Sequence, residues 1–183
     1  MKAGDVAALV IGGLMLWGLY LVTRRKKLDH QVLVYSAADI TGPRSVLPSP
    51  VDIAGQVRVI ARATLVKSPD QIGEGNPGIV GQGTWTPELT RLGWVLFWFG
   101  NGRQMAIAGI GGGNYFHINL EPVSVNEAHT YDLIFDKDGL LTASMDGREL
   151  VRTSVGPIQV TAGESLNINQ GDAFHIQELA LYV

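Results

Sequence analysis

An unbroken apolar run near the amino terminus is the feature that most constrains this chain. The 17 residues of Val6–Val22 carry no charge, and Arg24, Arg25, Lys26 and Lys27 follow almost at once. At about 1.5 Å per residue, a helix of this run would be roughly 25 Å long, slightly shorter than a hydrocarbon core of about 30 Å. Local thinning of the bilayer absorbs such a mismatch. The run therefore predicts one membrane-spanning helix.

The residues around the run favour a retained anchor over a cleaved signal peptide. Trp17 and Tyr20 lie toward the basic end, where aromatic rings prefer the membrane interface. A signal peptide ends in a small-residue cleavage site, whereas Thr23 and four basic residues follow this run. We therefore expect residues 1–27 to be an anchor with a basic stop, and residues 28–183 to be one globular domain.

The basic residues also predict how the anchor is oriented. Basic residues beside a membrane span stay preferentially in the cytoplasm, and the cluster at 24–27 outweighs Lys2 and the amino terminus. The expected orientation is therefore N-out and C-in, with the cluster close to anionic lipid headgroups.

Small residues recur at four-residue spacing along the anchor, at Gly4, Ala8 and Gly12. Such a ridge lets a second helix approach closely, which would make the anchor a site of helix packing. The alternative is that the glycines only reflect the composition usual in membrane helices.

Charge and cysteine content exclude several functions. Residues 28–183 carry nine Lys and Arg against sixteen Asp and Glu, a formal charge of −7, whereas residues 1–27 carry +4. An acidic domain is not expected to bind nucleic acid, and its charge should hold it away from an anionic bilayer. The chain has no cysteine, which rules out disulfides, thiol catalysis and cysteine zinc sites.

The rest of the chain has the pattern of an all-β protein. Alternation is clearest over 56–67, and glycine-rich turns separate many other short strand-like segments. Gly93–Phe99 is too apolar for an exposed strand and should lie across the core. Loops are expected over 41–52 and 68–78, and tight hairpin turns at 101–102, 111–114 and 146–147. No sustained helical periodicity follows residue 30, so ten to twelve short strands in a sandwich or barrel are expected.

Several of these segments, in this order, resemble the concanavalin A-like lectin and glucanase sandwich, in its laminin-G-like or pentraxin-like branch. The motifs are Ile79–Gly83 before Gly93-Trp94, the strand His129–Asp136, the hairpin turns Asp136–Gly139 and Met145–Arg148, and the closing strand Phe174–Tyr182. The tryptophan usual at the start of the 129–136 strand is absent. The resemblance implies a two-sheet antiparallel jelly roll in which the first and last strands pair. It implies sugar binding or adhesion as a common use, without implying an activity.

Acidic residues give weak evidence for chemistry. Glycoside hydrolysis needs two carboxylates flanking one bond, but Glu121, Glu127 and Glu149 are isolated near strand ends, so we expect no enzyme activity. Asp136, Asp138 and Asp146 are candidate calcium ligands. The stronger interpretation of these aspartates is that the turns themselves require them, so no cofactor is expected.

Other motifs are structural in our interpretation. The four histidines share no metal-ligand spacing, and His117 and His175 fit ordinary sheet positions. Gly109–Asn114 lacks the following helix that a phosphate loop needs.

Among aromatic residues, four are candidates for stacking on a sugar ring: Trp85, Trp94, Trp98 and Tyr115. Trp94 and Trp98 lie in a strongly apolar strand and should be core. Trp85 lies in a loop beside Pro87 and is the best candidate.

Two hypotheses for function follow. The first is a non-enzymatic, membrane-anchored structural protein that links a bilayer to a protein layer. The internal membrane of a tailless phage would suit it, with the domain facing the capsid and with other membrane or capsid proteins as partners. The alternative is a glycan-binding or adhesion module on a cell or virion surface. The predicted C-in side of the membrane favours the first, because a lectin has little to bind there.

Overall fold

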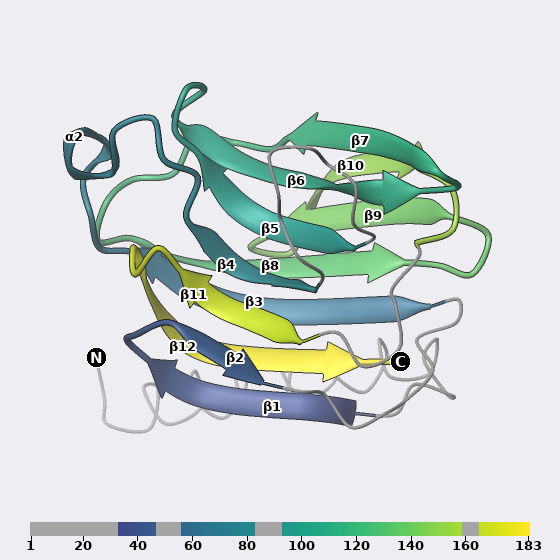
Figure 1. Cartoon of the computed structure of the whole chain (residues 1–183), viewed down its shortest axis with the longest axis horizontal. Helices are drawn as coiled ribbons and strands as arrows, with labels where there is room; N and C mark the ends of the chain where they lie inside the picture. The colour runs from purple at the N-terminus through teal and green to yellow at the C-terminus, as the bar shows by residue number, and fades with distance from the viewer. Residues whose placement is uncertain (1–32, 47–55, 83–92, 159–164) are drawn as a thin grey trace, which may run out of the picture. The chain divides into compact units, whose positions relative to one another are not determined.

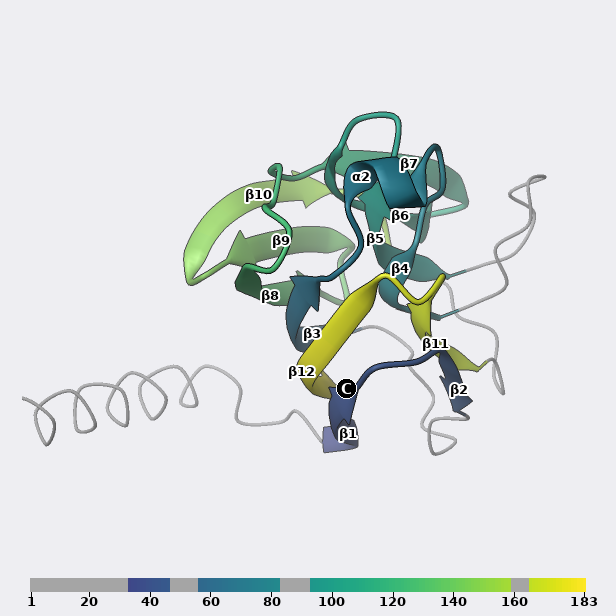
Figure 2. The same ribbon diagram turned by 90° about the vertical axis from the view of Figure 1, so that its left-hand side faces the viewer.

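Two antiparallel β-sheets stacked face to face make up the described part of the computed structural model, residues 33–46, 56–82, 93–158 and 165–183. The first sheet has the order β1-β12-β3-β8-β9-β10 and the second β2-β11-β4-β5-β6-β7. In Figure 1 the two sheets overlap as layers. Figure 2 shows the first sheet curving from β10 to β1 and the second from β7 to β2.

Among the described residues the first sheet has six strands, and three of its strand pairs contain a register irregularity. The six strands are β1 (Leu33–Ile40), β12 (Phe174–Tyr182), β3 (Val57–Leu65), β8 (Ala128–Phe135), β9 (Leu140–Met145) and β10 (Arg148–Ser154). The first and last strands of the described chain pair antiparallel, as the lectin resemblance implies.

The strands of the second sheet include the most apolar segment of the domain. They are β2 (Arg44–Val46), β11 (Leu166–Gln170), β4 (Gly78–Gln82), β5 (Trp94–Phe99), β6 (Gln104–Gly111) and β7 (Asn114–Asn119). The all-β, antiparallel sandwich predicted from the sequence is thereby confirmed for the described residues.

The core lies between the sheets because alternate residues of each strand point inward. Along β3, Val57, Val59 and Ala61 are buried, and along β5 Trp94 and Trp98 are almost fully buried. The two tryptophans are therefore core residues, as predicted.

Three local predictions differ from the structure. The expected loop 41–52 contains β2, which is too short to show a pattern in sequence. The expected loop 68–78 contains a one-turn helix, α2 (Pro69–Ile72), with Ser68 and Gln71 forming a reciprocal capping box. The turn expected at 101–102 is longer and spans residues 100–103.

Glycine is required where the β8–β9 turn and the end of β6 meet the backbone that follows β10. Gly139 has φ +82, and a Cβ there would lie 2.2 Å from the carbonyl carbon of Gly156. A Cβ on Gly111 would lie 2.1 Å from the carbonyl oxygen of Val155. The backbones touch directly, which lets the β10 end close against the β6–β7 hairpin.

No helix within the four described ranges is long and apolar enough to cross a bilayer. The run Val6–Val22, the basic cluster and the boundary at residues 27–28 lie outside those ranges, so the anchor remains a prediction.

Candidate functional site

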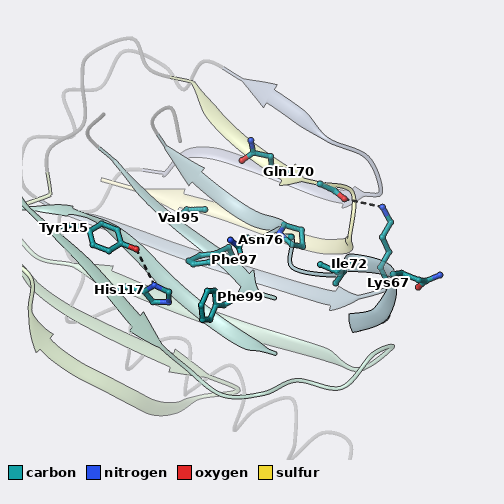
Figure 3. A pocket seen from close by; sticks show the side chains of 13 residues that line it. Lys67, Ile72, Asn76, Val95, Phe97, Phe99, Tyr115, His117 and Gln170 are labelled. Carbon is teal, nitrogen blue, oxygen red and sulfur yellow. Dashed lines mark hydrogen bonds between the residues drawn. The ribbon is translucent and has the colours of Figure 1, made fainter. Parts of the chain in front are cut away.

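A hollow of about 500 Å³ opens on the outer face of the second sheet. Its floor comes from β5 and β7, one wall from the connection between β3 and β4, and the other from the end of β11. We call it the groove. Figure 3 shows Phe97 and Phe99 at its centre, Tyr115 and His117 on one side, and Lys67, Ile72 and Asn76 on the other.

Strand β5 supplies the apolar floor because both of its faces are apolar. Trp94, Leu96 and Trp98 point into the core, so Val95 and Phe97 point outward by alternation. These outward residues form a second apolar cluster that is separate from the core. The strand is therefore apolar on the side that faces the groove, and its outward residues Val95 and Phe97, 6% and 5% exposed, form the buried base of the groove.

Three rings meet in the groove. The ring centroids of Phe99 and His117 are 4.9 Å apart, those of Phe97 and His117 are 5.7 Å apart, and each pair meets edge to face. The Tyr115 hydroxyl lies 3.4 Å from Nδ1 of His117, and Tyr115 is 45% exposed. Partial burial raises the pKa of the Tyr115 hydroxyl above its ordinary value of 10.0. Together they offer an aromatic surface with a polar edge.

The connection between β3 and β4 is pinned against the β5–β6 turn. The backbone N–H of Gly100 donates to Oδ1 of Asn76 at 3.1 Å, and the N–H of Trp98 donates to the carbonyl oxygen of Pro77 at 2.9 Å. Gly100 leaves no room for a side chain, since a Cβ there would lie 2.5 Å from the carbonyl oxygen of Gly75. The contact joins the turn at 100–103 to the β3–β4 connection that forms this wall of the groove.

Lys67 is the formally charged group among the described residues that line the groove. Its Nζ donates to the carbonyl oxygen of Gly171 at 3.3 Å and lies 3.8 Å from a carboxylate oxygen of Asp172. No aspartate or glutamate is among those lining residues. An acidic domain therefore presents a groove with a weakly positive lining.

Most of the predicted site residues lie outside the described ranges. These are the anchor residues Val6, Trp17, Tyr20, Val22, Arg24, Arg25, Lys26 and Lys27, the packing residues Gly4, Ala8 and Gly12, and the stacking candidate Trp85. Of the four aromatic candidates, Tyr115 alone lines the groove among the described residues.

Phe97, Phe99 and His117 were not anticipated as site residues. His117 had been interpreted as an ordinary sheet residue, but it faces the groove from the edge strand β7. The sequence does indicate such a site, because β5 is apolar on both faces and a strand of this kind packs against other groups on its outer face as well as on its inner face.

The calcium candidates do not converge. Asp136 and Asp138 lie in the β8–β9 turn, whereas Asp146 lies at the other end of β9, about 20 Å away along six residues of extended chain. The Asp136 carboxylate accepts from the backbone N–H groups of Asp138 and Leu140. No group of three acidic or histidine side chains suited to a metal occurs in the described ranges. The turn interpretation fits Asp136 directly.

Asp146 instead pairs with a histidine. Its Oδ2 lies 2.7 Å from Nδ1 of His129, and its Oδ1 accepts the backbone N–H of Thr130 at 2.8 Å. Burial alone would raise the pKa of Asp146, but these two hydrogen bonds and the charge of His129 hold it below its usual range. Burial, with the nearby Asp146 carboxylate, raises the pKa of Tyr131. This cluster fastens the β9–β10 turn to β8.

The isolated glutamates form ion pairs at the surface. Glu121 pairs with Arg148, and Glu149 pairs with Arg152. Neither glutamate lines the groove. Their positions give no pair of carboxylates flanking a ligand.

Comparison with known proteins places the chain by its fold. No protein-family model matches it, and no curated protein matches it in sequence. Among solved structures, the CBM40 domain of the Ruminococcus gnavus IT-sialidase bound to α2,6 sialyllactose is similar, with a TM-score of 0.62, 10% identity, and coverage of 82% of this chain and 93% of that chain.

Two further structures are similar at the level of fold. The Caenorhabditis elegans galectin LEC-6 has a TM-score of 0.50 at 9% identity, covering 80% of this chain and 94% of the galectin. The Trypanosoma rangeli sialidase in complex with sialic acid has a TM-score of 0.54 at 14% identity, covering 80% of this chain but 25% of the sialidase. Such identities establish fold alone, and the fold is that of lectin-like jelly-roll sandwiches.

Proposed function

We propose that the sandwich is a carbohydrate-binding module whose site is the groove on the second sheet. The observation that carries this proposal is a hollow in which the exposed Tyr115 and His117 lie beside the half-buried Phe99, over the buried Phe97. A sugar has apolar C–H faces that pack on aromatic rings and hydroxyls that bond to a polar rim. The groove offers both kinds of contact.

The fold comparisons support this alternative over the structural hypothesis. The CBM40 and T. rangeli sialidase structures contain sialyllactose and sialic acid, and the third similar structure is a galectin. Neither the comparisons nor the described residues support a membrane protein of a virion. A non-catalytic module is the simpler proposal, since the similar CBM40 domain is a binding domain and no carboxylate is among the described residues lining the groove.

The side of the membrane decides which glycans the module meets. The basic cluster at 24–27 predicts a cytoplasmic domain, whereas most glycans of cell surfaces lie outside. Protease protection in intact cells and in spheroplasts would show where the domain lies. A domain outside the membrane would reverse the predicted N-out, C-in orientation and agree with adhesion.

A glycan array probed with the full-length chain tests the proposal. The detergent should carry no sugar headgroup, because a glycosidic detergent would compete for the groove. We expect saturable binding that Tyr115→Ala weakens about fivefold, since loss of aromatic stacking costs about 1 kcal/mol. Tyr182→Ala, on the outer face of the first sheet, is the matched control and should bind as the original chain does.

Trp85 gives a second variant for the same array. It lies outside the described ranges and stays our prediction for an additional stacking residue. A signal that depends on Tyr115 but not on Trp85 would restrict the site to the groove. An array without any bound glycan would show the proposed function to be wrong.

A further inference from the structure

We propose that the end of the groove beside the β3–β4 connection binds an anionic group, a carboxylate or a sulfate, carried by the glycan. This inference rests on the proposed function and adds the chemical class of the ligand. Its basis is the direction of the hydrogen bonds at that end, where three side chains of the lining are left to act as donors.

Asn76 is oriented by the fold. Its Oδ1 accepts the backbone N–H of Gly100 at 3.1 Å, and only the oxygen of an amide can accept. The two polar hydrogens of the side chain therefore belong to Nδ2. Because Asn76 also lines the groove, it offers donors there while its acceptor serves the wall.

Gln71 is oriented in the same way by the capping box of α2. Its Oε1 accepts the backbone N–H of Ser68 at 2.7 Å, which assigns the donors to Nε2. Gln71 is also part of the lining. Two amides that would ordinarily recognise donors and acceptors equally are thus biased toward donation.

Lys67 adds a positive charge beside these amides. An ammonium group has three donors and no acceptor, and one of its hydrogens bonds to the carbonyl oxygen of Gly171. Its side chain is 40% exposed, so the charge is reachable from solvent. In Figure 3, Lys67 and Asn76 lie on the same side of the groove, across Phe97 and Phe99 from Tyr115.

The nearby carboxylates weaken the attraction of this end of the groove for an anion but do not cancel it. Asp172 lies 3.8 Å from Nζ of Lys67 and is 54% exposed, outside the lining. Asp70 is also outside the lining, and lies 3.6 Å from Arg103. A donor-rich end with one cation should therefore favour an anion with several acceptor oxygens over a hydroxyl, because charge-assisted hydrogen bonds are the stronger ones.

A matched set of sugars tests the preference. Lactose, its α2,3-sialylated form and its 3′-sulfated form share one neutral core, and an array of uronic-acid and sulfated oligosaccharides with their neutral parents extends the set. We expect the full-length chain to bind anionic members at least about tenfold more tightly than their neutral parents. Preference for the carboxylated or for the sulfated members identifies the anionic group. We expect this difference to shrink as salt rises.

Three substitutions locate the preference. Asn76→Asp and Gln71→Glu keep the oxygen that accepts from the backbone and replace the donor nitrogen with a second carboxylate oxygen, so the wall should keep its shape. Each should weaken anionic binding at least about tenfold more than it weakens neutral binding. Lys67→Gln should act in the same direction, while Lys137→Gln, at an exposed lysine in the β8–β9 turn, is the charge-matched control.

Asp172→Asn provides a change in the opposite direction. Removal of the carboxylate beside Lys67 should tighten anionic binding several-fold and leave neutral binding unchanged. If glycans bind but neutral members bind as well as anionic ones, and both carboxylate-introducing variants bind as the original chain does, this inference is wrong and the proposed function stands. If no glycan binds, both are wrong.

Discussion

On the outer face of the first sheet polar side chains pair with one another, whereas on the outer face of the second sheet aromatic side chains surround a hollow. Arg58 Nε and Nη2 donate to the two carboxylate oxygens of Asp132 at 2.9 and 2.8 Å, and Gln177 Nε2 donates to Thr64 Oγ1 at 2.7 Å. The second sheet presents Phe97, Phe99 and His117 at the equivalent place.

The difference teaches where a ligand is needed. The Arg58–Asp132 and Gln177–Thr64 pairs satisfy polar groups on the first sheet's outer face, and Gln177 Oε1 is the buried atom of these pairs without a hydrogen bond in the described part of the chain. On the second sheet's outer face Val95 and Phe97 are only 6% and 5% exposed, and the exposed Tyr115 and His117 lie beside them around the groove, where a ligand can make contact. We therefore treat the first outer face as structural and the second as functional.

The largest loss of stability should come from disrupting the backbone contact between Gly139 and Gly156, at the end of the sandwich where Gly156 also contacts Gly111 of the second sheet. Gly139→Ala should lower the free energy of unfolding by at least about 3 kcal/mol, because it forces a left-handed φ and a clash with Gly156. Gly113→Ala is the matched control, since Gly113 has the same φ of +82 with nothing within 4 Å. Urea unfolding followed by tryptophan fluorescence measures both. Equal losses would show that this contact is not tightly packed.

The next effect tests the paired face. Asp132→Ala should cost about 2–3 kcal/mol, because the largely buried Arg58 guanidinium loses two charge-assisted hydrogen bonds. Glycan binding of the folded variant should be unchanged. Glu149→Ala, which removes an exposed partner of Arg152, should change the urea midpoint little. Lost glycan binding in folded Asp132→Ala would mean that the faces are coupled.

A pair of histidines compares the two faces directly. His117→Ala should weaken glycan binding about tenfold, because it removes one ring of the aromatic cluster. His175→Ala, on the first sheet's outer face, should bind as the original chain does. Titration calorimetry with the best glycan from the array gives both affinities. Equal affinities for the two variants would contradict the assignment of the groove as the site.

The smallest effect concerns acid stability at the β9–β10 turn. The lowered pKa of Asp146 means that its carboxylate stabilises the fold above its ordinary value of 3.8, and that this contribution disappears as pH falls through the lower folded value. Asp146→Asn, which suits the positive φ there, should be slightly less stable at neutral pH and less sensitive to acid. Urea midpoints between about pH 6 and about pH 2 test this. Parallel acid curves for both chains would contradict it.

Much of the sandwich could be predicted because strand alternation and turn chemistry act locally. The segment 56–67 contains β3, and Gly112-Gly113 and Asp146-Gly147 have the positive φ values of tight hairpins. The helix α2 was missed although Ser68-Pro69-Asp70-Gln71 carries the capping-box pattern, because one helical turn shows no periodicity. The strand β2 depends on pairing with β11, which is 120 residues away.

Sequence alone determined the core and the apolar character of both faces of β5, because these depend on residue type and spacing. It also predicts the membrane anchor, whose orientation the protease-protection experiment would test. Only the tertiary structure decided that the outward residues of β5 meet His117 from β7 and a wall from the β3–β4 connection. The tertiary structure also orients the Asn76 and Gln71 amides, since a backbone N–H donates to the side-chain oxygen of each.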